Sequence, residues 1–279
     1  LTRTPYGQKI PAGKTLIHNT LNADDINKDE AVDIALVGDT RLTLQALIAA
    51  VGARLQGDRG AAREALEADV AALRADWLAD WHPALHGEQT PLSYYRVIQA
   101  LDSCLDLENS IVTHDAGAPR DCMVPFYTAS VPHSYIGWGK TTHLGFGIPL
   151  MIGAKIAAPE KFCLNLMGDG AFGMSGSDIE TAVRCGAAIT TVLLNNSAMA
   201  TYSGPTQGTI GQAARERFGV STMQGDYAKI AEGMGAVGLR VSHAEELAPA
   251  LAEAQRLNKA GKTVLIDVLA NVEDRRARF

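Results

Sequence analysis

The stretch KFCLNLMGDGAFGMSGSDIETAVRCGAAITTVLLNN, residues 161–196, decides the fold of this chain. Its first apolar run, 162–167, predicts a buried strand of a parallel sheet, and the run 189–194 predicts a second one. The segment between them predicts a tight turn at Gly168-Asp169-Gly170, followed by a helix. Such a unit brings the residues that follow both strands to one edge of the sheet, where open α/β sheets bind their ligands.

The helix between the two strands is expected to begin near Ser177 and to end near Gly186. Ser177 and Glu180 have the S-x-x-E spacing of a capping box, in which each side chain satisfies a backbone N–H group of the other residue. The sequence therefore predicts a capped helix start at Ser177.

Two interpretations compete for the glycine-rich turn. Gly168, Gly170 and Gly173 form the G-x-G-x-x-G pattern of dinucleotide-binding proteins. That pattern expects an acidic residue at the end of the next strand to bind the ribose, and Asn195 and Asn196 stand there instead. The dinucleotide interpretation therefore leaves the polar residues after the second strand unexplained.

A metal-diphosphate site explains more of these residues. An aspartate after one strand and an asparagine after the next can give oxygen ligands to one hard cation, while the glycine-rich turn offers N–H groups to a diphosphate. Gly168-Asp169-Gly170, then 24 residues, then Asn195-Asn196 resembles the thiamine diphosphate binding motif. The remaining interpretation is structural, with a helix-capping Asp169 and a turn-forming asparagine pair.

The resemblance implies a set of site residues. Mg²⁺ would be bound by the carboxylate of Asp169, the side-chain oxygen of Asn196 and the backbone carbonyl of Ala198. Leu144, in the run His143-Leu144-Gly145-Phe146-Gly147, would hold thiamine in its bent form, and His143 is a candidate proton shuttle beside the pyrimidine. The full set of residues expected to contact thiamine diphosphate comprises Ala118, Thr142, Leu144, Gly168, Gly170, Ala171, Asn196 and Met199.

Bulk composition narrows the class of protein. The 279 residues carry a net charge of −6, which argues against a nucleic-acid partner. No apolar run approaches the roughly 20 residues that a membrane-spanning helix needs. The four cysteines show no C-x-x-C spacing and are expected to stay reduced in a cytoplasmic protein.

The chain is expected to have an α/β architecture in three parts. Residues 1–55 predict two strands and a helix, too few for a sheet of their own, and resemble the end of the central Rossmann-like domain of acetolactate synthase-like enzymes. Residues 56–90 predict a helical linker, on which Trp77 and Trp81 share one face. Residues 91–279 are expected to form the parallel-sheet thiamine diphosphate-binding domain.

The resemblance also implies a reaction and a partner. Enzymes of this class make or break a C–C bond next to a carbonyl, and a glutamate of a separate pyrimidine-binding domain activates their cofactor. We expect that glutamate on a second chain, in an α2β2 heterotetramer. The substrate is expected to be a 2-oxo acid, in a decarboxylase or carboligase. The alternatives are an acyl-CoA substrate, as in 2-hydroxyacyl-CoA lyase and oxalyl-CoA decarboxylase, and a non-catalytic cofactor-binding subunit.

Thr20 and Asn22 stand where members of the family often carry an acidic residue that binds the ribose of FAD or ADP, so binding of either nucleotide stays open.

Overall fold

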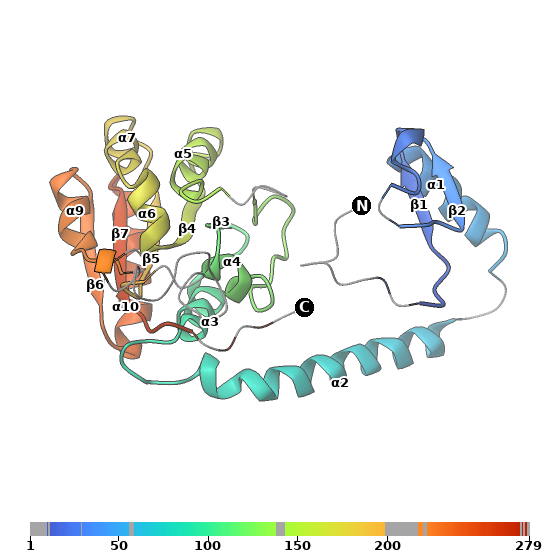
Figure 1. Cartoon of the computed structure of the whole chain (residues 1–279), viewed down its shortest axis with the longest axis horizontal. Helices are drawn as coiled ribbons and strands as arrows, with labels where there is room; N and C mark the ends of the chain where they lie inside the picture. Colours follow the sequence, from blue (N-terminus) through green and yellow to red (C-terminus); the bar gives the residue numbers. More distant parts are fainter. Residues whose placement is uncertain are drawn as a thin grey trace. The chain divides into compact units, whose positions relative to one another are not determined.

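The protein forms two compact units, residues 1–76 and 77–278. The computed structural model describes residues 10, 12–28, 30–55, 59–137, 143–198, 217–219, 222–273, 275 and 277. Figure 1 labels the helices and strands of both units.

The first unit contains a two-stranded parallel sheet and a helix that follows it. Strands β1 (Ile17–Thr20) and β2 (Ile34–Val37) pair in register, with η2 (Ala23–Asp25) between them and α1 (Thr40–Gly52) after them. The side chain of Asn19 donates hydrogen bonds to the carbonyl oxygens of Leu36, at 2.8 Å, and Gly38, at 3.2 Å. These bonds connect the strands to the turn before α1. The predicted two strands and helix are confirmed.

The second unit is built on a five-stranded parallel sheet with the order β3-β4-β5-β7-β6 (Figure 1). Its strands are β3 (Ser110–His114), β4 (Phe162–Gly168), β5 (Thr190–Asn195), β6 (Val237–Val241) and β7 (Val264–Leu269). The two strands predicted from the stretch 161–196 are therefore adjacent in the sheet. Since every pair is parallel, the carboxyl ends of all five strands lie at one edge.

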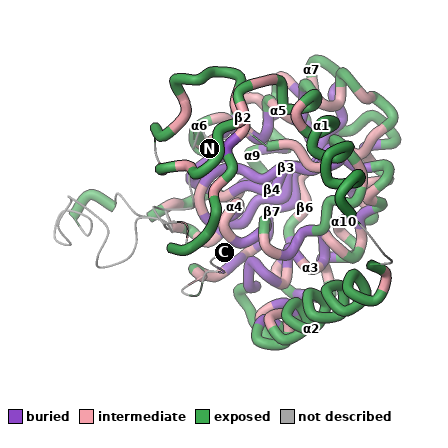
Figure 2. Tube along the Cα trace, turned by 90° about the vertical axis from the view of Figure 1, so that its right-hand side faces the viewer, coloured by how far each residue is buried: buried purple, intermediate pink, exposed green. Residues whose placement is uncertain are grey.

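Helices cover both faces of this sheet, and each face has its own apolar core. Along β4, Leu164 and Leu166 join one core, whereas Cys163 and Met167 join the other. This alternation is the two-residue period of a strand buried on both faces. Figure 2 shows the central strands as the buried layer of the unit. The first core also includes α3 (Tyr94–Cys104), α4 (Ala118–Met123) and α10 (Leu247–Lys259), and the second includes α5 (Gly147–Ala157), α6 (Asp169–Ser175), α7 (Asp178–Arg184) and α9 (Tyr227–Gly233).

The segment after β4 differs from its prediction. A short helix, α6, begins at Asp169 itself in place of the expected tight turn, and α7 follows at Asp178. The predicted capping box is wrong, because Ser177 has helical backbone angles (φ −60°, ψ −23°) and its side chain caps nothing. Glu180 instead accepts hydrogen bonds from Arg184 on the same helix.

The carboxyl-terminal end of α2 (Gly60–Leu85) packs on the second unit through aromatic side chains. Trp77 stacks on Phe126 with ring centroids 4.8 Å apart, and Trp81 lies 4.7 Å from the ring of Tyr95. The guanidinium of Arg275 lies 3.9 Å from the centroid of Trp81. These contacts within the unit account for the shared face of the two tryptophans.

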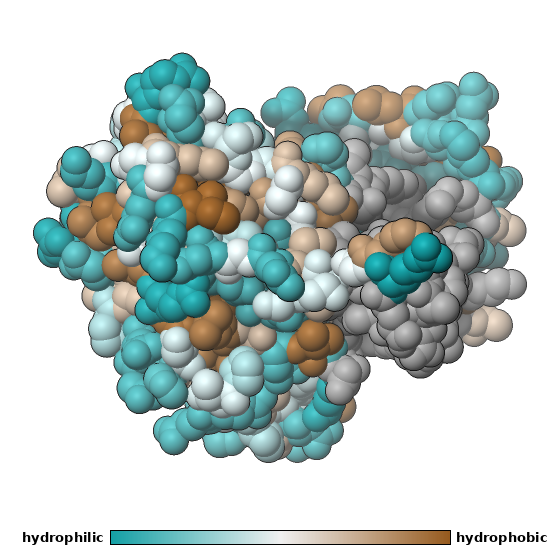
Figure 3. Space-filling view, turned by 60° about the vertical axis from the view of Figure 1, so that its left-hand side comes forward, coloured by the Kyte–Doolittle hydropathy of each residue, from teal (hydrophilic) through white to brown (hydrophobic). Residues whose placement is uncertain are grey.

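The surface carries apolar side chains in separate places. On the face that Figure 3 presents, they form several groups between hydrophilic residues. In the second unit, Ile156 and Met174 are the most exposed examples on α5 and α6. Single exposed apolar side chains of this kind are usual on protein surfaces. Within the described residues, no helix combines the length and the apolar character required to cross a membrane.

Candidate functional site

Polar residues that follow three adjacent strands meet at the carboxyl edge of the five-stranded sheet. Asp115 follows β3, Asp169 follows β4, and Asn196 follows β5. The strand pairing fixes their proximity, because Gly168 at the end of β4 is level with Leu194 near the end of β5. The sheet thus juxtaposes the aspartate and asparagine that the sequence motif separates by 24 residues.

Asp169 is a buried carboxylate with one unused oxygen. Its side chain is 2% exposed, and its Oδ1 accepts a hydrogen bond of 2.7 Å from the N–H of Gly170. Its Oδ2 is buried without a hydrogen-bond partner in the part of the chain that the structure describes. Burial raises the pKa of Asp169 to about 6, against the lowering effect of the backbone N–H groups of Gly170, Ser197 and Ala198. The carboxylate therefore lies beside the turn that follows Asn196.

Asn196 is held in one orientation by two hydrogen bonds. Its Nδ2 donates to the hydroxyl oxygen of Tyr94, and its Oδ1 accepts from the N–H of Ala198 at 3.0 Å. The donor and acceptor roles identify which side-chain atom is oxygen. Ser197, between them, has φ of +55°, a conformation that is uncommon for residues other than glycine. The chain thus makes a tight turn that directs the Asn196 oxygen toward residue 198.

Asn195 lies one residue before this turn and is fixed from the neighbouring strand. Its Nδ2 donates to Oδ1 of Asp267 on β7 at 2.9 Å. Asp267 is fully buried, and its Oδ2 also accepts from the N–H of Tyr227 at 3.1 Å and from Arg240 at 2.8 Å. Asp267 therefore connects β5, β6, β7 and α9 directly behind the motif.

The segment 143–147 contains the predicted thiamine-bending residue. Leu144 is partly buried and packs against the core that contains α5 and α6, whereas His143 is exposed. The N–H groups of Gly145 and Gly147 donate to the two carboxylate oxygens of Asp115, at 3.0 and 2.9 Å. The segment is thereby attached to the end of β3.

The other predicted contacts divide into described and undescribed residues. Ala118 is buried at the start of α4, and Gly168, the last residue of β4, lies near the side chain of Pro119. Gly170 and Ala171 are buried in the first turn of α6. Thr142 and Met199 lie outside the described residues.

Three side chains at this edge were not predicted from the sequence: Tyr94, Asp115 and Asp267. Asp115 follows a strand, as Asp169 does, and this position was a usable signal. Tyr94 occupies an apolar helix face, where it resembles an ordinary core residue. Arg120 on α4 forms an ion pair with Asp121 of the same helix at 2.6 Å.

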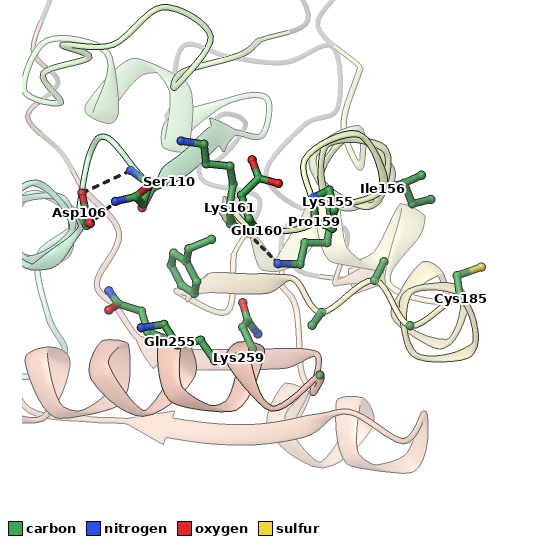
Figure 4. Close-up of a pocket in the computed structure, with 17 residues that line it drawn as sticks. Asp106, Ser110, Lys155, Ile156, Pro159, Glu160, Lys161, Cys185, Gln255 and Lys259 are labelled. Carbon is green, nitrogen blue, oxygen red and sulfur yellow. Dashed lines mark hydrogen bonds between the residues drawn. The ribbon is translucent and has the colours of Figure 1, made fainter.

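A cavity of about 650 Å³ lies at the opposite, amino edge of the sheet. Figure 4 shows its lining, which includes Lys155, Lys161 and Gln255, with Lys155 donating to the carbonyl of Lys161 at 2.7 Å. Ser110 and Phe162, which begin β3 and β4, also line it. The cavity is therefore separate from the motif residues, which follow the other ends of these strands.

The oxygen atoms that the sequence predicts as cation ligands belong to a carboxylate, a side-chain amide and a backbone carbonyl. No cluster of three His, Cys, Asp or Glu side chains suited to a metal occurs among the residues that the structure describes. A site made of Asp169, Asn196 and the carbonyl of Ala198 would differ from such a cluster, because it has one carboxylate and two neutral oxygen ligands. Oxygen ligands of these kinds are typical of Mg²⁺.

Comparison with known proteins connects this edge to a family. The thiamine pyrophosphate enzyme, C-terminal TPP binding domain family matches residues 115–268. Acetolactate synthase isozyme 3 large subunit of Escherichia coli is 27% identical over 91% of this chain and 43% of its own length. Sulfoacetaldehyde acetyltransferase of Alcaligenes xylosoxydans is 30% identical over 67% of this chain and 31% of its own length. The chain spans less than half the length of these curated relatives. The chain belongs to the thiamine pyrophosphate enzyme family and carries its C-terminal TPP-binding domain.

Proposed function

We propose that this chain is the diphosphate- and Mg²⁺-binding subunit of a thiamine diphosphate-dependent enzyme that breaks or forms a C–C bond next to a carbonyl. The observation that supports this most directly is the juxtaposition of the unpartnered Oδ2 of Asp169 with the Asn196–Ala198 turn. A buried carboxylate oxygen without a partner is costly, and a bound cation removes that cost.

The residues present fit the metal. Asp169 offers a carboxylate oxygen, Asn196 offers its Oδ1, and Ala198 offers its backbone carbonyl. All three are oxygen donors, as Mg²⁺ requires. The bond from Asn196 to Tyr94 keeps the nitrogen of the amide away from the cation position. Gly170 and Ala171 would provide N–H groups to the diphosphate, with the Gly170 N–H shared with Asp169.

The cofactor, when bound, supplies a carbon nucleophile and an electron sink. The chain's own contribution is to position it and to shield it from water. Leu144 would support the bent form of the cofactor, with Ala118, Thr142, Gly168 and Met199 around it. His143 is exposed next to this segment and would exchange protons with the substrate or with water.

The glutamate that activates the cofactor is proposed to come from a pyrimidine-binding domain on a second chain. Glu180 and Glu232 are the glutamates of α7 and α9, and Glu180 forms an exposed ion pair with Arg184. The relatives are longer than the part of them that this chain matches, so they contain further sequence in which such a domain can lie. An α2β2 assembly would place each cofactor between the two domain types.

We propose a 2-oxo acid as the substrate. This choice rests on relatives whose names describe acetolactate synthases and an acetyltransferase. No observation of the site favours an acyl-CoA.

The test is cofactor binding and turnover by the protein isolated from its source together with any chain that accompanies it. Isothermal titration should show thiamine diphosphate binding only with Mg²⁺, and pyruvate should be decarboxylated or condensed. Asp169→Ala should lose binding at least tenfold and activity with it, while Glu180→Ala, a surface change on the adjoining helix, should keep both. Binding that needs no Mg²⁺, or that survives Asp169→Ala, would remove the proposed site. Loss of binding with unchanged activity would identify a non-catalytic subunit.

A further inference from the structure

Asp115 forms an unusual connection between the end of β3 and the segment that carries Leu144. The residue is fully buried. Its Oδ1 accepts from the N–H of Ala116 at 2.7 Å and from that of Gly145 at 3.0 Å, and its Oδ2 accepts from Gly147 at 2.9 Å. The two glycine donors lie 30 and 32 residues further along the chain. One carboxylate thus attaches a distant segment at two points.

The bond to Gly145 fixes the peptide unit that contains the Leu144 carbonyl. In a trans peptide, the N–H of one residue and the C=O of the preceding residue point in opposite directions. Because the Gly145 N–H points to Asp115, the Leu144 carbonyl points away from it. Asp115 therefore sets both the direction of this carbonyl and the path of the chain on which the Leu144 side chain is carried.

Glycine is required at both positions for the segment to lie this close to α6 and β4. Gly145 has φ of +86°, and a Cβ atom there would come within 2.9 Å of the Cβ and Oγ atoms of Ser175. A Cβ atom at Gly147 would lie 2.0 Å from the Oδ1 of Asn165. The close contacts of these glycines with α6 and β4, and their two hydrogen bonds to Asp115, hold the segment 145–147 in the same position.

A carboxylate suits this position better than an amide. It can accept on both oxygens, whereas an asparagine would present an NH₂ group to one of the N–H donors. Burial raises the pKa of Asp115, and the N–H groups of Gly147, Gly145 and Ala116 oppose that effect. Among the described residues, the three donors to Asp115 are all backbone N–H groups, so these bonds depend on the position of the backbone.

We propose that Asp115 is a positioning residue, which acts through the Leu144–Gly145 peptide to place Leu144 and its carbonyl against the aminopyrimidine ring of thiamine diphosphate. This inference rests on the proposed function, because it assigns a role to the contact that bends the cofactor. Asp115 itself would touch neither the cofactor nor the substrate.

The test compares Asp115→Asn with Asp102→Asn in the complete enzyme. Asp102 also accepts a hydrogen bond from the backbone, a bond of 3.1 Å from the N–H of Thr128 that an asparagine can preserve. In Asp115→Asn, the dissociation constant of thiamine diphosphate should change less than threefold, since the diphosphate anchor is intact. The rate of hydrogen–deuterium exchange at the C2 carbon of the bound cofactor should fall at least tenfold, and Asp102→Asn should change neither.

Amide exchange separates failure of this inference from failure of the proposed function. In the wild-type protein, without cofactor, the amides of Gly145 and Gly147 should exchange more slowly than that of exposed His143, and Asp115→Asn should remove this protection. If the variant does not fold, the wild-type exchange still decides whether Asp115 holds the segment. Unprotected glycine amides, or an unchanged C2 exchange rate in Asp115→Asn, would overturn the proposal. Protected amides in a protein that binds no thiamine diphosphate would reject the proposed function instead.

Discussion

The side-chain amide of Asn196 donates a hydrogen bond to the hydroxyl oxygen of Tyr94, a residue 102 positions earlier in the chain. Tyr94 is 2% exposed on α3, and its ring belongs to the apolar core on that face of the sheet. A rigid core residue thereby determines which atom of Asn196 is directed to the proposed cation. The orientation of a proposed metal ligand thus depends on the packing of a helix.

Replacing Tyr94 with phenylalanine should weaken Mg²⁺-dependent binding of thiamine diphosphate about fivefold, because the loss of one hydrogen bond costs about 1 kcal/mol. Titration calorimetry at fixed Mg²⁺ measures the effect. Tyr95→Phe is the matched control, since Tyr95 is also buried on α3 but bonds to the backbone of Arg275 and Ala277. Equal losses of cofactor affinity in the two variants would contradict the role assigned to Tyr94.

The sequence predicted the strands of this fold well because their signal is local. The run 162–167 is apolar at five of six positions and the run 189–194 at four of six, with two β-branched threonines, and they form the buried strands β4 and β5. The proximity of Asp169 to the turn after Asn196 could also be predicted from the sequence, because parallel strands bring their carboxyl ends together. Site residues that directly follow a strand can therefore be predicted from their spacing in the sequence.

Interactions that depend on the folded topology could not be found in this way. Tyr94 reaches Asn196 only after α3 has packed, and nothing local distinguishes Tyr94 from Tyr95. The position of Asp115 after β3 could be noticed in the sequence, but its partners Gly145 and Gly147 could not be predicted from that position. The capping box failed for a different reason. Ser177 matches the pattern, but α6 ends directly before it, so its backbone is already helical and its hydroxyl has no free N–H group to accept from.

Asp169→Asn should stabilise the protein in the absence of metal while removing its Mg²⁺-dependent cofactor binding. The pKa of about 6 means that ionised Asp169 is disfavoured in the folded state, which costs about 1 to 3 kcal/mol at pH 7. The asparagine does not incur this cost. Urea unfolding at pH 7, with EDTA and then with Mg²⁺ and thiamine diphosphate, measures both effects. Glu180→Gln, which alters an exposed ion pair, should change the free energy of unfolding by less than about 0.5 kcal/mol.

Mg²⁺ affinity should fall on acidification through pH 6. Only the ionised carboxylate binds the cation, and Asp169 takes up a proton below a pKa of about 6, so the affinity should be about tenfold lower at pH 5 than at pH 7. The stability of the metal-free protein has the opposite trend. A folded pKa above the unfolded value of 3.8 means that Asp169 reduces stability as the pH rises from about 4 to 6.

The measurement is the Mg²⁺-induced rise in melting temperature in the presence of thiamine diphosphate, recorded from pH 5 to pH 7.5. Asp169→Asn should give no Mg²⁺-dependent rise at any pH. A rise that is constant across this range in the wild-type protein would show that Asp169 is not the titrating ligand.

Gly147→Ala should destabilise the protein and weaken cofactor binding together. The added Cβ atom would overlap the Oδ1 of Asn165, which lies fully buried on β4, so α5 or the strand would have to move. Overpacking of this kind costs about 1 to 3 kcal/mol. Gly153→Ala, on the same helix with open space around the new Cβ atom, is the control and should be neutral or stabilising. A stable Gly147→Ala variant with full cofactor affinity would show that the segment tolerates displacement.

Arg240 offers a comparison of two ion pairs made by one side chain. It lies 2.8 Å from the buried carboxylate of Asp267 and 3.0 Å from that of partly exposed Asp226. Asp267→Ala should lower the free energy of unfolding by about 3 to 5 kcal/mol, because it also removes the acceptor for Asn195 and for the Tyr227 N–H group. Asp226→Ala should cost much less, since Asp226 and Arg240 are both partly exposed and Asp226 otherwise caps the start of α9. Urea unfolding of the two variants measures the difference. Similar losses in both would mean that the charge of Arg240, rather than the buried connection through Asp267, stabilises this edge of the sheet behind Asn195 and Asn196.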